Sequence, residues 1–508
     1  MQTVSFNDVS YRYESMQDML FENLDLSFSP GWTGIVGANG SGKTTLLQLA
    51  TGVLVVNRGS VQCPGVALYC PQRTDAPPPA FVELLDAPDP SSYETAGRLG
   101  VEHDWLERWT TLSHGERKRA QIATALWRNP LVLAVDEPTN HLDESARALL
   151  ADALRRYEGI GLLVSHDRAL LDELCGHCLF IYDGQAPVMR PGNYSQASAQ
   201  AERERSHAID QMHAARKETV RLERETRRRR VEADRSAKRR SKRGIPIHDH
   251  DARFKRNLAR VSGKDGQSGR LLRQLEGRVE QARRRSAALS VDKRSELGVS
   301  VHGAACQRDI LLHMPAATLP LGPTRALQVP GFTVAPGERV AITGDNGTGK
   351  STLVRRLVQS CPIPDERLVY VPQELDSHEA RNLLEQVRGL PGPVLGRMMT
   401  MVSRLGSRPE GLLRTQLPSP GETRKLLLAL GMAREPYLIM MDEPTNHMDL
   451  PSVQCLEQAL ADCGCALLLV SHDRRFLRAL TDREWRTTAA GPGQWRLTEA
   501  IGADDVNP

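Results

Sequence analysis

The sequence predicts two similar α/β domains joined by a long α-helical hairpin, and three observations support this fold class. Five short motifs occur twice, in the same order, in the two halves of the 508-residue chain. In each half, short apolar runs alternate with stretches of helical composition, as in α/β domains built on a parallel sheet. Between the halves lies a segment rich in Ala, Arg, Glu, Gln and Lys. The expected boundaries are 1–195 for the first domain, 196–292 for the linker and 293–508 for the second domain.

The duplication is clearest in the string DEPTNH, which runs from Asp136 to His141 and again from Asp442 to His447. A glycine-rich loop, a Pro-Gln pair, a Ser-X-Gly-Glu and a Ser-His-Asp accompany each copy. The equivalent positions are Gly37 and Gly344, Gln72 and Gln373, Ser113 and Ser419, Asp136 and Asp442, and His166 and His472. Their separations are 307, 301, 306, 306 and 306 residues, which indicates two domains of similar length.

Continuous apolar runs mark the expected central strands. Leu131–Val135 and Tyr437–Met441 precede the two acidic pairs, and Gly161–Val164 and Ala466–Val470 precede the two histidines. Such runs are typical of parallel strands that are covered on both faces. Near the N-terminus, the spacing of Val4, Phe6 and Val9 also predicts a strand.

Composition argues against a membrane or secreted protein. The chain is 40% hydrophobic and 25% charged, and no apolar run approaches the roughly 18 to 20 residues that a bilayer requires. The N-terminus does not resemble a signal peptide, so we expect a cytoplasmic protein. The nine cysteines are then expected to be reduced. Cys175 and Cys178 form a C-x-x-C without a second ligand pair, which favours buried thiols over a metal or redox site.

The middle segment is predicted to be a basic helical hairpin. A first helix is expected from about Ser195 to Arg243, a break at 244–247, and a second helix from about Asp251 to Ser290, with 263–269 as a candidate interruption. At about 1.5 Å per residue, 45 helical residues reach roughly 65 Å. Residues 201–290 contain 27 Lys or Arg and 13 Asp or Glu, a net charge of +14, whereas the rest of the chain carries −10.

Both glycine-rich loops satisfy G-x-x-x-x-G-K-[ST], which predicts two phosphate-binding loops. Glycines let the backbone N–H groups face the phosphates, and the lysine reaches the outer phosphates. The residues expected to bind ATP here are Gly37, Asn39, Gly40, Gly42, Lys43, Thr44 and Thr45 in the first half and Gly344, Asn346, Gly347, Gly349, Lys350, Ser351 and Thr352 in the second.

The motifs that follow predict magnesium binding and hydrolysis. Mg²⁺ requires hard oxygen ligands, and the expected ligands are Thr44 and Asp136 in the first half and Ser351 and Asp442 in the second. Glu137 and Glu443 come directly after the apolar strands, where a carboxylate can orient the attacking water and accept its proton. His166 and His472 follow the next strands and are expected to sense the γ-phosphate.

Together these residues resemble those of ABC-type ATPases, over about four fifths of the chain. Ser113 and Gly115, like Ser419 and Gly421, resemble the signature motif of that family. Gln72 and Gln373 resemble its Q-loop glutamines, which implies that they bind ATP and serve as further Mg²⁺ ligands. The resemblance implies that the signature of each domain completes the ATP site of the other. His114, Pro418 and Pro420 depart from the usual signature, so the two sites could hydrolyse ATP at different rates. Tyr13 resembles the aromatic residue that stacks on adenine, or is a core or edge aromatic, and the second half offers no clear counterpart.

The stretches from Glu137 to Asp143 and from Glu443 to Asp449 are similar to the hallmark of the ABC-F family. This resemblance implies a tandem ATPase that binds the ribosome, with the hairpin directed to the exit-site region, the peptidyl tRNA and the rRNA nearby. The candidate RNA contacts at the hairpin tip are Arg243, His248, Arg253, Lys255 and Arg256. A basic segment also matches RNA phosphate electrostatically, although a hairpin that touches nothing but solvent has the same composition.

Several functions remain open on the sequence alone. Within the ribosome hypothesis, the chain is either a translation factor or a resistance protein that displaces an antibiotic. The alternative class is the tandem ATPase subunit of an ABC transporter, against which the basic hairpin argues. A DNA-repair or chromosome ATPase would need inserted coiled coils or paired zinc cysteines, so no DNA partner is expected. We expect a monomer in which the two ATPase domains pair with each other, with ATP and Mg²⁺ as cofactors.

Overall fold

A computed structural model describes residues 2–140, 142–182, 184–240, 264–288, 306, 308–407, 409–415, 417–446 and 448–500. Its contacts divide the chain into two units, Met1–Ala197 with Leu297–Pro508 and Ser198–Glu296. The first unit holds both repeats and the second holds the linker. His141, His447 and the expected RNA contacts Arg243, His248, Arg253, Lys255 and Arg256 lie outside the described residues.

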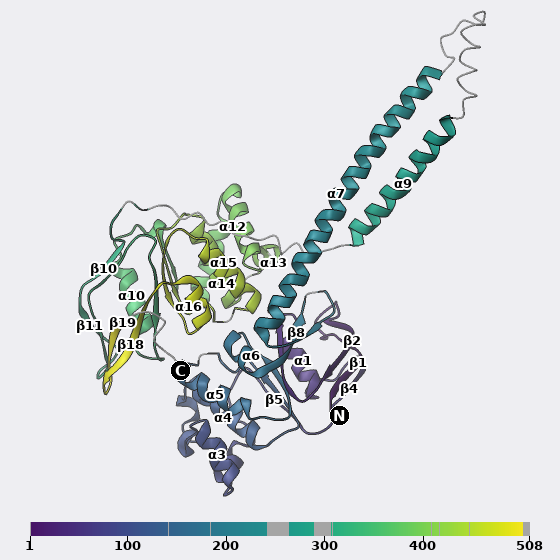
Figure 1. The fold of residues 1–508 in the computed structure, drawn as a ribbon. Helices are drawn as coiled ribbons and strands as arrows, with labels where there is room; N and C mark the ends of the chain where they lie inside the picture. The colour runs from purple at the N-terminus through teal and green to yellow at the C-terminus, as the bar shows by residue number, and fades with distance from the viewer. Residues whose placement is uncertain are drawn as a thin grey trace, which may run out of the picture. The chain divides into compact units, whose positions relative to one another are not determined.

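The first repeat is built on a mainly parallel sheet (Figure 1). Its strands are β1 Val4–Tyr11, β2 Phe21–Phe28, β3 Gly31–Gly37, β4 Arg58–Gln62, β5 Ala67–Cys70, β6 Val132–Asp136, β7 Ile160–Val164, β8 Cys175–Ile181 and β9 Val188–Pro191. The central sheet has the order β5-β6-β7-β3-β8-β9, in which only the β8–β9 pair is antiparallel among the described strands. A second sheet has the order β2-β1-β4 and is antiparallel.

Helices cover the sheet of the first repeat and contribute to its core. They are α1 Lys43–Ala50, α2 Phe81–Asp86, α3 Pro90–Arg98, α4 His114–Trp127, α5 Glu144–Arg155 and α6 Arg168–Leu174, with 3-10 turns at His103–Trp105 and Trp109–Thr111. Every residue of β6 and β7 is buried, which confirms the apolar runs as central strands. The side chains of Val4, Phe6 and Val9 are also buried on β1, as their spacing predicted.

The second repeat has the same central topology. Its strands are β10 Leu312–Met314, β11 Ala317–Pro320, β12 Ala326–Val329, β13 Phe332–Val334, β14 Arg339–Thr343, β15 Leu368–Val371, β16 Leu438–Asp442, β17 Ala466–Val470, β18 Arg483–Gly491 and β19 Gln494–Ala500. The large sheet has the order β11-β12-β19-β18-β14-β17-β16-β15, and β10 pairs with β13. In both repeats, the strand before the glycine-rich loop therefore lies beside the strand that leads to the histidine.

The helices of the second repeat are α10 Lys350–Ser360, α11 Ser377–Arg388, α12 Gly392–Arg404, α13 Pro409–Arg414, α14 Pro420–Met432, α15 Leu450–Ala461 and α16 Arg474–Leu480, with a 3-10 turn at Asp365–Arg367. Strands β16 and β17 are fully buried, again as predicted. None of the helices in the described ranges combines the length and the hydropathy that a bilayer crossing needs. The thiols of Cys175 and Cys178 are buried on β8.

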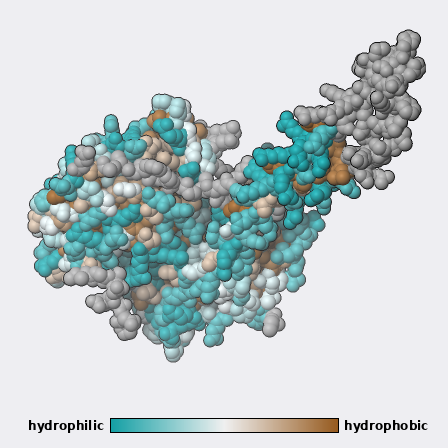
Figure 2. Space-filling model, turned by 45° about the horizontal axis from the view of Figure 1, so that its top comes forward, coloured by the Kyte–Doolittle hydropathy of each residue, from teal (hydrophilic) through white to brown (hydrophobic). Residues whose placement is uncertain are grey.

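The described part of the linker unit is formed by α7 Tyr194–Arg240, which begins in the first unit, and by α9 Lys264–Ala288. Leu222 on α7 packs against Leu275 and Val279 on α9, and the ion pairs Arg230–Glu276 and Glu223–Arg283 join the two helices. The visible surface of both helices is mostly hydrophilic (Figure 2). The expected interruption at 263–269 is wrong for the described part, because α9 continues unbroken from Lys264 through Gly266 and Gly269.

Candidate ATP-binding sites

The first glycine-rich loop connects β3 to α1 and has the backbone shape that phosphate binding requires. Gly40 and Gly42 have φ values of 79° and 94°, a region that L-residues with a Cβ rarely adopt. The Nζ of Lys43 donates to the carbonyl oxygens of Gly37 and Ala38, each at 2.9 Å. Burial lowers the pKa of Lys43, although the charges of nearby carboxylates act in the opposite direction. The ammonium group therefore lies over the loop, where an anionic ligand would compensate it.

The second loop repeats this geometry. Gly347 and Gly349 have φ values of 75° and 97°. The Nζ of Lys350 donates to the carbonyl oxygens of Gly344 and Asp345, each at 2.7 Å, and burial lowers the pKa of Lys350. Because loop shape and lysine position agree in both copies, both loops are suited to hold a polyphosphate.

Hydroxyl and carboxylate oxygens meet beside each loop, at the position expected for magnesium. Thr44 Oγ1 donates to Asp136 Oδ2 at 2.8 Å, and the Tyr69 hydroxyl donates to the same oxygen at 3.2 Å. Burial raises the pKa of Asp136 and of Asp442. Asp442 Oδ1 is buried and has no hydrogen-bond partner among the described residues. A buried, unsatisfied carboxylate oxygen beside Ser351 fits a hard cation such as Mg²⁺.

Glu137 lies between Asp136 and the histidine of the same domain. Its φ of 44° is a strained conformation for a residue other than glycine. Glu137 Oε2 accepts the backbone N–H of His166 at 3.1 Å, and Oε1 lies 3.0 Å from His166 Nε2. Burial, reinforced by the charge of Asp136, raises the pKa of Glu137 to about 8. A carboxyl group with a pKa near the working pH can accept the proton of an attacking water.

The second site has the same arrangement with longer contacts. Glu443 has a φ of 50°, and its Oε2 accepts the backbone N–H of His472 at 3.3 Å. The His472 Nε2 lies 3.4 Å from Glu443 Oε1 and 3.1 Å from Asn346 Oδ1. Burial raises the pKa of Glu443 to about 7. Burial and the charges of Lys350 and Arg147 lower the pKa of His472 to about 3, so its imidazole is neutral at pH 7.

Both signature motifs cap a helix. Ser113 is the N-cap of α4 and Ser419 is the N-cap of α14, and each forms a capping box with the glutamate three residues later. Pro420 occupies the first turn of α14, where the backbone N–H that proline lacks would form no hydrogen bond within the helix. A Cβ on Gly115 would lie 2.9 Å from Leu142 Cδ2, so the signature helix α4 packs directly on the segment between β6 and α5 of its own repeat.

Two equivalent aspartates, Asp449 and Asp143, each act on the glycine-rich loop of the opposite repeat. The backbone N–H of Asn39 donates to Asp449 Oδ2 at 2.7 Å, and the charge of Asp449 raises the pKa of Lys43 against the effect of burial. The charge of Asp143 acts in the same direction on the pKa of Lys350. Each lysine is therefore influenced by an aspartate of the opposite repeat, which supports the expectation that each ATP site is shared.

The residues on the expected adenine side differ between the repeats. Tyr13 packs edge-on against Tyr11, and its hydroxyl lies 2.9 Å from Thr45 Oγ1, so Thr45 is buried. In the second repeat, Thr352 is exposed. Arg325 donates to the carbonyl oxygen of Gly347, and its guanidinium lies 4.8 Å from the ring centroid of Trp495. Sequence patterns missed this pair because the two residues are far apart in the chain.

Two buried cations connect the remaining motifs, and the sequence reading missed both. Lys118 Nζ donates to the carbonyl oxygens of Pro71 and Asp136, at 2.7 Å and 3.1 Å, and burial lowers the pKa of Lys118 to about 8. Arg424 donates to the carbonyl oxygens of Gln373 and Asn446. Lys118 and Arg424 each follow the signature serine by five residues, so the repeat itself could have identified them. Gln72 is exposed just after β5, and Gln373 is half-buried just after β15.

Comparisons with known proteins agree with this geometry. The family model described as "ABC transporter" matches residues 21–140 and 327–446. The tylosin resistance ATP-binding protein TlrC of Streptomyces fradiae is 30% identical over 547 residues, which cover 94% of this chain and 96% of that protein. The ribosome protection protein VmlR of Bacillus subtilis is 28% identical over 496 residues, 94% of this chain and 85% of that protein.

A solved structure shows the same fold. It is the archaeal ribosome recycling factor aABCE1, in complex with the archaeal ribosomal stalk protein aP1. Its TM-score is 0.63 at 20% identity, and the match covers 96% of this chain and 89% of that chain. At this identity the likeness concerns the fold alone.

Proposed function

The chain belongs to the ABC-F family of tandem ABC ATPases, and on that premise we propose that it is an ATP-driven factor that acts on the ribosome in the cytoplasm. The observation that carries this proposal is the basic linker between two ATPase repeats, with a net charge of +14 over residues 201–290. On α7, the consecutive arginines from Arg227 to Arg230 are all exposed. Exposed guanidinium groups bind the phosphate backbone of RNA without reading its sequence.

The names of two relatives support the proposal of a ribosome-directed function. VmlR is named a ribosome protection protein, and TlrC is named a tylosin resistance protein. We propose that the linker of this chain reaches the exit-site and peptidyl-tRNA region, where it modulates translation or dislodges a bound antibiotic. The tip residues Arg243, His248, Arg253, Lys255 and Arg256 remain the proposed RNA contacts.

The ATP cycle would switch this action on and off. Bound ATP would hold the two repeats together, with Lys43 and Lys350 on its phosphates and the signatures at Ser419 and Ser113 supplied by the opposite repeats. Glu137 and Glu443 would orient the attacking water and accept its proton. Mg²⁺ held beside Asp136 and Asp442 would neutralise phosphate charge. Hydrolysis would then release the repeats from each other and the factor from the ribosome.

Trapping the ATP-bound state tests the ribosome proposal directly. The double variant Glu137→Gln and Glu443→Gln is expected to sediment with ribosomes in the presence of ATP and to inhibit translation. The matched control is the same variant with ADP, which should remain in the supernatant. Recovery with membranes instead of ribosomes would support the transporter-subunit alternative and overturn the proposal.

The role of the hairpin charge is tested separately. Changing Arg227, Arg228, Arg229 and Arg230 to Gln should weaken ribosome binding and leave ATP hydrolysis without ribosomes unchanged. Each lost phosphate contact should reduce the slope of log affinity against log salt by about 0.7 to 0.9.

The control removes four exposed charges elsewhere on α7, at Arg203, Arg205, Arg216 and Lys217. Equal weakening by both sets would show general attraction rather than a specific contact, and no change in binding would contradict the role of the hairpin. An antibiotic-susceptibility panel of cells with and without the chain then separates resistance from general translation.

A further inference from the structure

One of the positions at which the two repeats differ lies next to the histidine loops. Helices α5 and α15 occupy equivalent places, and both begin after an aspartate N-cap, Asp143 or Asp449. Arg147 is the fourth residue after the first aspartate, and Val453 is the fourth after the second. Val453 is buried in the core of its own repeat, and its side chain can supply neither a charge nor a hydrogen bond.

Arg147 connects its own repeat to the histidine loop of the other. Its Nε forms an ion pair with Asp167 Oδ2 at 3.0 Å, and its Nη1 donates to the main-chain carbonyl oxygen of His472 at 3.3 Å. The Arg147 and Asp167 side chains are 23% and 8% exposed. Asp167 also caps α6, so this end of the ion pair is held by a fixed backbone. The guanidinium of Arg147 is therefore pre-oriented toward the second repeat.

His472, whose carbonyl oxygen accepts from Arg147, also contacts Glu443, the candidate base of the second site. The main-chain N–H of His472 donates to Glu443 Oε2, and the ring of the same histidine contacts Glu443 and Asn346. The position of the His472 main chain thus sets the orientation of the Glu443 carboxylate. The charge of Arg147 also acts on both groups: it opposes the burial that raises the pKa of Glu443, and it adds to the burial that lowers the pKa of His472.

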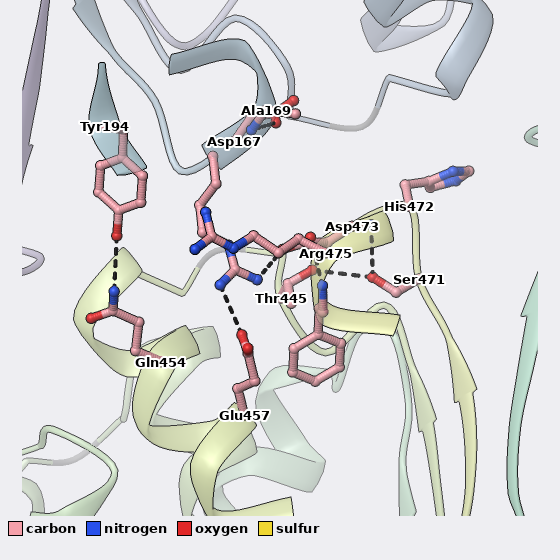
Figure 3. Close-up of polar contacts among 12 residues, drawn as sticks. Asp167, Ala169, Tyr194, Thr445, Gln454, Glu457, Ser471, His472, Asp473 and Arg475 are labelled. Atoms are coloured by element: carbon pink, nitrogen blue, oxygen red, sulfur yellow. Dashed lines mark hydrogen bonds and ion pairs between the residues drawn. The ribbon is translucent and has the colours of Figure 1, made fainter. Parts of the chain in front are cut away.

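A second cross-repeat contact holds the same loop. Arg168, which is 3% exposed, pairs with Glu457 at 2.8 Å and with Asp473 at 3.1 Å. Figure 3 shows His472 and Asp473 side by side on the second repeat, with Asp167 across from them on the first repeat. The equivalent arginine, Arg474, instead forms an exposed pair with Glu144. The histidine loop of the second repeat therefore contacts the buried Arg168 and the partly exposed Arg147 of the first repeat, whereas Arg474 of the second repeat forms only a surface pair with the first.

We propose that Arg147 is a positioning residue for the second ATP site: by holding the main chain of His472, it makes hydrolysis at Glu443 depend on contact with the first repeat. The position of Val453 means that the first site lacks this particular link. Loss of the Arg147 contact then slows ATP turnover at the second site more than at the first.

The test measures each site by itself. Glu137→Gln leaves hydrolysis to the second site, and Glu443→Gln leaves it to the first. Arg147→Ala is introduced into both backgrounds, and single-turnover hydrolysis of bound ATP is followed by rapid quench. We expect a loss of about tenfold in the Glu137→Gln background, which corresponds to about 1.4 kcal/mol, and less than about twofold in the other.

Further readouts separate positioning from folding. Arg147→Lys keeps a charged donor and should recover part of the lost rate, and the KM for ATP should change little because Arg147 touches neither glycine-rich loop among the described contacts. Arg155→Ala is the control, since Arg155 lies on the same helix but pairs with Asp152 and Glu173 of its own repeat. Equal losses in both backgrounds, or an unchanged rate in the Glu137→Gln background, would overturn the proposal.

Discussion

Replacing Glu137 with Gln is expected to stabilise the nucleotide-free protein, and the effect should grow with pH. Glu137 is 6% exposed, and its folded pKa of about 8 compares with 4.5 for the free side chain. A raised pKa means that the folded state binds the proton more tightly than the unfolded state. The contribution of this group to stability is therefore fully present below pH 4.5 and is lost as the pH rises through about 8.

The size of the effect follows from the shift. One pKa unit corresponds to about 1.4 kcal/mol. Because the Glu137 carboxyl ionises more readily in the unfolded state, the free energy of unfolding falls by roughly 3 kcal/mol between pH 4.5 and pH 7. Glutamine has the same shape and does not titrate. For domains of this size, the difference corresponds to a rise in Tm of roughly 5 to 10 °C in the variant at neutral pH.

The assay is thermal unfolding without nucleotide or Mg²⁺ between pH 5 and pH 8, followed by circular dichroism. The Tm difference between Glu137→Gln and the parent should be small at pH 5 and increase steadily toward pH 8. The control Glu158→Gln changes an exposed glutamate of the same repeat and should show no such trend. A Tm difference that is independent of pH would refute the reasoning, because it would mean that the buried carboxyl does not titrate in this range.

Two further perturbations test contacts described above. Arg168→Met removes a guanidinium whose two carboxylate partners are about one fifth exposed; we expect a loss of about 2 kcal/mol in stability, less than the 3 to 5 kcal/mol of a fully buried pair. Arg474→Met, which breaks only the exposed pair with Glu144, should shift Tm by less than about 1 °C, and equal shifts would contradict the difference in burial. Tyr13→Ala should weaken nucleotide binding at the first site about tenfold, as expected for loss of a stacking surface, whereas Tyr13→Phe should cost little; equal losses would assign the role to the hydroxyl contact with Thr45.

Much of the candidate sites could be predicted because their geometry is local. A loop that begins after a buried strand and contains Gly40 and Gly42 has few backbone conformations available, and those place Lys43 over the loop. The duplication then gives the second site at Lys350 without new information. Lys118 and Arg424 were missed, although their equal spacing from the signatures is visible in the sequence.

Other errors and omissions have a different origin. The expected interruption near Gly263–Gly269 did not occur at its described residues, because glycine lowers helix propensity by only about 1 kcal/mol and the pairing of α7 with α9 outweighs it. Arg325 and Trp495 are separated by 170 residues and meet only because β12 and β19 are parallel neighbours in one sheet.

The sequence by itself determined the duplicated ATPase chemistry, the family and the charge of the linker, because each depends on residues close together in the chain. Only the tertiary structure decided how the repeats act on each other. Arg147 and His472 are 325 residues apart, and Arg168 and Glu457 are 289 residues apart. Their contacts depend on how two folded surfaces pack, and differences between the equivalent helices α5 and α15, such as Arg147 against Val453, make that packing unequal.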